Sequence, residues 1–128
     1  MKEVLIIFFI LLIIIFGNLY INKYLNKSAK ALLNDLDNLK NNIEQQNISQ
    51  NDLIQESEDL YIHWGEINKK WSNIILHEEI DSIETALIRT KSKIKMEKND
   101  ECLEDINTAI FLVNHITEKE KTSLKNIF

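Results

Sequence analysis

Residues 4–21, VLIIFFILLIIIFGNLYI, form the one stretch of this 128-residue chain that water would not tolerate exposed. Its first thirteen residues include no polar side chain. Eighteen helical residues at about 1.5 Å each nearly cross a hydrocarbon core of about 30 Å, and no charge near the middle opposes insertion. Tyr20 and Tyr24 lie where the aromatic belt of a membrane interface is expected. The stretch therefore predicts a transmembrane helix, and we assign residues 1–24 to the signal-anchor of a single-pass protein in the cell membrane.

A cleaved signal peptide is the competing interpretation of this start, because it too begins with a Lys and an apolar core. Ala29-Lys30-Ala31 has the small-x-small form of a cleavage site. A polar spacer that contains Lys23 and Lys27 separates this site from the apolar stretch, and signal peptidase rarely accepts such a spacer. A buried helix of a soluble protein would need a polar face, which the stretch lacks. We therefore favour an uncleaved anchor.

The charges on either side of the stretch give conflicting indications of its orientation. Three lysines follow it, whereas Lys2 and the terminal amine precede it, so the positive-inside rule places the C-terminal part in the cytoplasm. An uncleaved export anchor with a short N-terminal tail would instead place that part outside. By a small margin we favour the extracytoplasmic side.

The composition favours helices and argues against a nucleic-acid partner. No Pro and only two Gly leave few of the turn signals that strands need. Residues 1–30 carry four Lys and one Glu, so residues 31–128 hold a net charge of −8 within the overall −5. Such an acidic surface repels phosphate backbones. With Cys102 as its single cysteine, the chain can form neither an internal disulfide nor a thiolate metal cluster.

An apolar stripe continues beyond the anchor at helical spacing, in alternating steps of four and three residues. Its members are Leu25, Ala29, Leu32, Leu36, Leu39 and Ile43. Residues 25–48 are therefore predicted to form an amphipathic helix that is continuous with the anchor. A homo-oligomer formed through a short coiled coil at residues 28–46 is an alternative use of the same face.

Residues 49–128 are predicted to complete an all-α fold, a small antiparallel bundle of three or four helices with an apolar C-terminal tail that folds back on it. Ser49 followed by Asp52 resembles a capping box at a helix start. The side chains that we expect to hold the core are Trp64, Ile67, Trp71, Ile83, Leu87, Leu103, Ile106 and Ile110.

The middle of the chain contains a glycine within a helical pattern and a segment that fits either one helix or two. Gly65 interrupts a helical pattern at a cost of about 1 kcal/mol relative to Ala, so we expect it to allow close packing or a bend beside Trp64. Residues 52–98 fit one long helix or two shorter ones, because His77-Glu78-Glu79 could simply continue the helix.

The most site-like cluster is His77-Glu78-Glu79-Ile80-Asp81, in which Asp81 lies one helical turn after His77 and could share a metal or a proton with it. The zincin motif needs a second His at the position that Asp81 occupies. A His and Asp pair at this spacing is ordinarily a solvated ion pair on a helix surface. We predict no enzyme activity, no cofactor, and no catalytic, cofactor-binding or metal-binding residue. A metal sensor or enzyme based on the His77 cluster is the third hypothesis.

The chain resembles, over nearly its whole length, a family of small single-anchor proteins from spore-forming Firmicutes, a domain of unknown function. The residues that carry the resemblance are Trp71, the His77–Asp81 element and the closing Leu124-Lys-Asn-Ile-Phe128. The resemblance implies a membrane address and an all-helical fold, and it implies no activity.

Together these patterns predict a membrane-anchored helical protein that acts as a protein-interaction or scaffolding module. Its expected partners are the lipid bilayer and a protein of unknown identity, recognised through a helix face. The residues that we expect to contact the partner are His77, Glu78, Asp81, Ile127 and Phe128.

Overall fold

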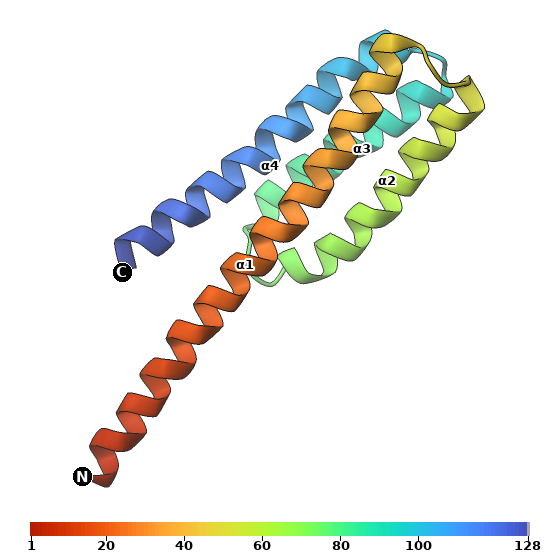
Figure 1. The fold of residues 1–128 in the computed structure, drawn as a ribbon. Coiled ribbons are helices and arrows are strands. Elements are labelled where there is room, and N and C mark those ends of the chain that lie inside the picture. Colours follow the sequence, from red (N-terminus) through yellow and green to blue (C-terminus); the bar gives the residue numbers. More distant parts are fainter. Residues whose placement is uncertain (128) are drawn as a thin grey trace.

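The computed structural model describes residues 1–127, apart from the side chains of Leu124, Asn126 and Ile127. These residues form four helices that run alternately up and down: α1 (Lys2–Gln45), α2 (Gln50–Trp71), α3 (His77–Lys95) and α4 (Asn99–Ile127), as Figure 1 shows. The predicted all-α antiparallel bundle is confirmed. Residues 52–98 form two helices, and the connection between Trp71 and His77 separates them.

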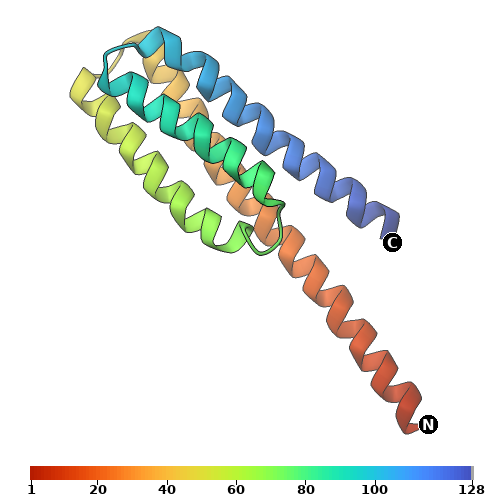
Figure 2. The ribbon, with the colours of Figure 1, turned by 180° about the vertical axis from the view of Figure 1, so that it is seen from behind.

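Helix α1 is one continuous helix of 44 residues whose two halves lie in different surroundings. Its N-terminal half projects from the bundle (Figures 1 and 2). Most of the apolar side chains on this half are exposed. The most apolar segment of α1 is 0% buried. Among the described residues, α1 is the one helix long and apolar enough to cross a membrane. A signal sequence would meet the same criteria of length and composition.

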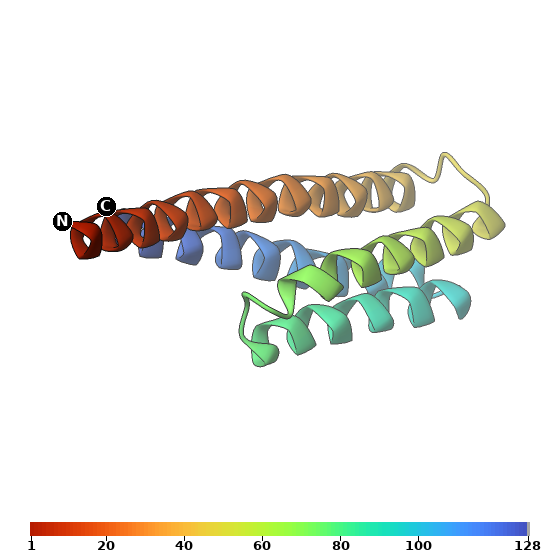
Figure 3. The same ribbon diagram turned by 90° about the horizontal axis from the view of Figure 1, so that it is seen from below.

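The C-terminal half of α1 forms one wall of the bundle. Helix α1 packs against α2 and α4, and α3 packs against the same two helices on the opposite side, so that each helix has two neighbours (Figure 3). The predicted stripe is confirmed, because Leu32, Leu36 and Leu39 are each 0% exposed. The alternative hypothesis, a coiled coil between two copies at residues 28–46, does not fit the folded chain. The side chains that such a coiled coil would require are already covered by the other helices of the bundle.

The predicted core residues of α2 and α3 are all buried, but the prediction for α4 is correct only in part. Leu103 and Ile110 are only partly buried, whereas the predicted Ile106 is buried together with Cys102, Ala109, Val113 and Ile116. These five positions keep the alternating steps of four and three. The innermost line of α4 thus lies one residue, or about 100° around the helix, from two of the predicted positions.

Two indole rings from the C-terminal part of α2 lie in the core of the bundle. Trp64 and Trp71 are each 0% exposed, and their rings meet edge to face with centroids 5.8 Å apart. The expectation of close packing at Gly65 is wrong, because a Cβ built at this residue would meet no atom within 4 Å. The predicted cap at the start of α2 is confirmed, since the Ser49 hydroxyl oxygen accepts a 3.2 Å hydrogen bond from the backbone N–H of Asp52.

Helix α4 is longer than its neighbours and carries the chain back toward the anchor. It has 29 residues, against 22 in α2 and 19 in α3. It continues to Ile127 along the direction of α1, past the connection between α2 and α3 (Figures 1 and 2). The predicted tail is thus a continuation of α4 as far as Ile127, not a segment that folds back, and Phe128 lies outside the described residues.

Candidate functional site

The His77 cluster lies at the start of α3, where Leu76 serves as an N-cap that makes no side-chain hydrogen bond. His77, Glu78 and Asp81 are all exposed, and no side-chain hydrogen bond or ion pair joins them in the described part of the chain. The structure also brings neither of the other histidines to them. His63 pairs with Asp35, and His115 stacks on Phe111.

Metal binding would require several ligands that converge on one point. Within residues 1–127, excluding the undescribed side chains, no group of three or more His, Cys, Asp or Glu residues has a geometry that could hold a metal ion.

The member of the His77 cluster that forms an ion pair is Glu79, which was not a predicted site residue. Its Oε1 lies 3.0 Å from Nζ of Lys119 and ties the start of α3 to α4.

Glu84 links α2 to α3 inside the bundle and was missed by sequence reasoning. Its carboxylate accepts hydrogen bonds from the Tyr61 hydroxyl, at 2.5 Å, and from Nε1 of Trp64. The hydrogen bond to this carboxylate, together with burial, raises the pKa of Tyr61 above its ordinary value. Lys91 lies over the Tyr61 ring, 4.4 Å from its centroid. The Glu84 carboxylate thus accepts hydrogen bonds from the buried Trp64 and the partly buried Tyr61 and holds α3 against α2, which is a structural role.

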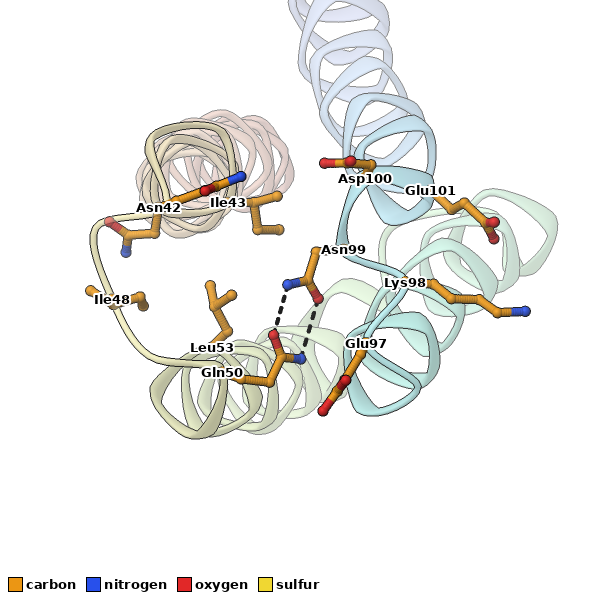
Figure 4. Close-up of a pocket in the computed structure, with 11 residues that line it drawn as sticks. Asn42, Ile43, Ile48, Gln50, Leu53, Glu97, Lys98, Asn99, Asp100 and Glu101 are labelled. Atoms are coloured by element: carbon orange, nitrogen blue, oxygen red, sulfur yellow. Dashed lines mark hydrogen bonds between the residues drawn. The ribbon is translucent and has the colours of Figure 1, made fainter.

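A cavity of about 500 Å³ lies at the end of the bundle farthest from the anchor (Figure 4). Gln50 at the start of α2 and Asn99 at the start of α4 face one another across it with reciprocal amide hydrogen bonds of 2.7 and 3.3 Å. The Gln50 amide also donates to the carbonyl oxygen of Ile94 at 2.6 Å. The lining residues are Asn42, Ile43, Gln46, Ile48, Gln50, Leu53, Glu97, Lys98, Asn99, Asp100 and Glu101.

This distal cavity is polar, but its central amides are already occupied with one another. Such an arrangement closes the ends of three helices, and it offers no nucleophile beside a general base. The pair could not be found from the sequence, because 49 residues separate its members and no periodic pattern relates them.

Asp105 is a buried carboxylate on α4, 7% exposed, and Nζ of Lys93 on α3 lies 2.7 Å from its Oδ2. The hydrogen bond to Asp105 is the main cause that raises the pKa of Lys93. One turn before Asp105, burial and the nearby carboxylate raise the pKa of the Cys102 thiol to about 11. The one cysteine is therefore a protonated core residue at neutral pH, not a reactive thiol.

Residues 19–127 match the family described as a domain of unknown function, DUF4363. The chain belongs to the DUF4363 family. The match covers α1 from residue 19 onward together with α2, α3 and α4, and it confirms the resemblance to a domain of unknown function. No curated protein and no solved structure matches this DUF4363 chain.

Proposed function

We propose that this DUF4363 protein is a single-pass membrane protein whose four-helix domain acts as a protein-interaction or scaffolding module at the cell membrane. The observation that carries the proposal is the division of α1 into an exposed apolar half and a buried half. Ile13 is 69% exposed, whereas Leu32 in the same helix is 0% exposed. The exposed apolar half of α1 would be stable inside a lipid bilayer, because its side chains would be removed from water there.

Retention of the anchor is supported by what cleavage would remove. Cleavage after Ala31 would delete Leu25, which is 1% exposed in the core, and Ser28, whose hydroxyl accepts the indole hydrogen bond of Trp71. The domain would lose part of its core and leave a buried donor without a partner. The fold therefore favours a chain that keeps its first helix.

Continuity of α1 also favours a scaffolding role over a mobile one. No break lies between the apolar stretch and the core stripe, so the anchor and the bundle share one helix. The domain would stand at a fixed height above the bilayer, with the distal cavity farthest from it. A module of this kind presents its outer helix faces to other proteins at the membrane.

Phe111 on α4 is the best-placed side chain for such a contact. It is 67% exposed, and its ring stacks on His115 with centroids 6.1 Å apart and an angle of 15° between the planes. Large aromatic side chains commonly anchor protein interfaces. His77, Glu78 and Asp81 are exposed at the start of α3 and remain predicted contacts, whereas Phe128 and the side chain of Ile127 lie outside the described residues.

Alkaline carbonate extraction of cell membranes, followed by N-terminal sequencing, tests the anchor. We expect the full chain to stay in the membrane fraction with Lys2 present, and an Ile10→Arg/Ile13→Arg variant to be released. Recovery of a protein that begins at Leu32, or release of the unmodified chain, would refute the anchor.

Orientation and partner contact need separate measurements. A cysteine at exposed Asn47, with Cys102 changed to Ala, should react in intact cells with a maleimide that cannot cross membranes if the domain is outside.

A photo-crosslinking residue at Phe111 should give a discrete adduct, whereas the same residue at exposed Asp59 on α2 should not. Equal adducts at both positions, or none, would argue against recognition through this face of α4.

A further inference from the structure

We infer that this chain binds the phosphate of an anionic phospholipid headgroup in a cleft between α1 and α2, at the end of the bundle from which the anchor emerges. The inference rests on the proposed membrane anchoring. The cleft has a volume of about 360 Å³, and four residues from each helix line it. They are Tyr24, Lys27, Ser28 and Ala31 on α1, and His63, Glu66, Ile67 and Lys70 on α2.

The position of the cleft matches the headgroup layer. Lys27 lies six residues, less than two helical turns, beyond the apolar stretch that ends at Ile21. Figures 1 and 2 both show the C-terminal end of α2 beside α1 where α1 leaves the bundle. If residues 4–21 cross the bilayer, the cleft opens at the level where lipid phosphates are concentrated.

The fold brings two cations from distant parts of the sequence to this cleft. The hydrogen bond of 2.8 Å between Nε1 of Trp71 and the Ser28 hydroxyl fixes the end of α2 against α1. The neighbouring Lys70 then places its Nζ 4.8 Å from the centroid of the Tyr24 ring. Among the described side chains, neither Lys27 nor Lys70 takes part in an ion pair. Two lysines from different helices thus line one cleft, and no carboxylate among the described side chains pairs with either of them.

The surrounding charge also favours a negative ligand. Lys23 and Lys30 lie one turn before and after Lys27 on α1, and Lys69 precedes Lys70 in the last turn of α2. Glu66 is the one acid among the lining residues, and Nδ1 of His63 lies 2.6 Å from the Asp35 carboxylate.

The opposite corner of the same end is acidic, because α3 begins with two glutamates in its first turn. Helix α3 packs against α2 and α4, not against α1. A flat contact of the whole end with anionic lipid would therefore bring Glu78 against like charge. The basic edge between α1 and α2 is the part of this end that fits a phosphate, with the Tyr24 ring beneath the ammonium group of Lys70.

The test reconstitutes the full chain into phosphatidylcholine vesicles and into vesicles of equal parts phosphatidylcholine and phosphatidylglycerol. Lipid that stays bound after gentle extraction is then counted by native mass spectrometry. We expect the chain to retain phosphatidylglycerol preferentially, and Lys27→Gln/Lys70→Gln to lower that preference on the order of tenfold, because each juxtamembrane lysine contributes separately to anionic lipid binding. Lys40→Gln/Lys98→Gln, at the distal part of the bundle, is the matched control and should leave the preference unchanged.

A second variant keeps the test informative if the lysine pair perturbs folding, which circular dichroism would reveal. Glu66→Gln removes the acid from the cleft and should raise the preference for phosphatidylglycerol. An unchanged preference in the Lys27/Lys70 variant, or an equal loss in the control, would overturn the site. Displacement of the lipid by inorganic phosphate at equal concentration would overturn the assignment to lipid. Incorporation into both kinds of vesicle without any lipid preference would refute the cleft and leave the anchor intact, whereas failure to incorporate into either would refute the anchor.

Discussion

Nε1 of Trp71 on α2 donates a hydrogen bond of 2.8 Å to the hydroxyl oxygen of Ser28 on α1, at the level where the anchor helix leaves the bundle. The Ser28 hydroxyl in turn donates to the carbonyl oxygen of Tyr24 at 2.8 Å. Trp71 is 0% exposed, so its indole N–H has little access to water. At this level the anchor helix and the bundle are therefore joined by a satisfied polar contact as well as by apolar packing.

Ser28→Ala should destabilise the domain by about 1 to 3 kcal/mol, because it leaves the buried indole N–H without an acceptor. Urea unfolding of the full chain in detergent micelles, followed by Trp fluorescence, measures the change. Ser82→Ala is the matched control, since the exposed Ser82 hydroxyl bonds to a carbonyl within its own helix and its loss should cost no more than about 0.5 kcal/mol. Equal effects of the two changes would contradict the role of Ser28.

Leu36→Ala should cost about 2 to 5 kcal/mol, because it opens a cavity at a position that is 0% exposed. Asp37→Ala, at the next and exposed position, should be nearly neutral. Sedimentation equilibrium in density-matched detergent should give a monomer for all three chains. A dimer that Leu36→Ala converts to a folded monomer would instead support the coiled coil at residues 28–46.

Gly65→Ala should stabilise the domain by up to about 1 kcal/mol, because Ala has the higher helix propensity and its Cβ would meet no atom within 4 Å. The same urea titration measures this increase. A loss of stability would show that the helix needs glycine at this point, as the sequence suggested.

Cys102 should react with Ellman's reagent far more slowly than a cysteine placed at exposed Asn47 in a Cys102→Ala chain, because its thiol is buried and its pKa is raised to about 11. Between the ordinary pKa of 9.0 and about 11, the unfolded chain loses this proton while the folded chain keeps it. The folded state then binds more protons, so the free energy of unfolding should fall as pH rises through this window. Cys102→Ala should remove that part of the pH dependence. Rapid labelling of native Cys102 at neutral pH would contradict its burial.

Local periodicity determined much of this fold. Steps of four and three residues place side chains on one face of a helix whatever the rest of the chain does, so the stripe from Leu25 to Ile43 and the core positions of α2 could be identified before any tertiary information. The apolar stretch at residues 4–21 was equally evident, because its character depends on composition alone. The cap at Ser49 likewise depends on residues within three positions of one another.

The tertiary structure decided which residues meet across helices. Leu103 and Ile110 share a broad apolar face with Cys102 and Ala109, and the positions of α1 and α3 determine which of them lie innermost. The end of α2 carries no Pro or Gly, so local chemistry did not mark it.

The cross-helix pairs, Gln50 with Asn99 and Ser28 with Trp71, join residues more than forty positions apart. Long-range contacts of this kind leave no periodic signal in one sequence, because they depend on the register in which whole helices pack. The sequence alone therefore determined the helices and the apolar anchor, while the packing of the helices decided where charge, cavities and exposed aromatic side chains gather.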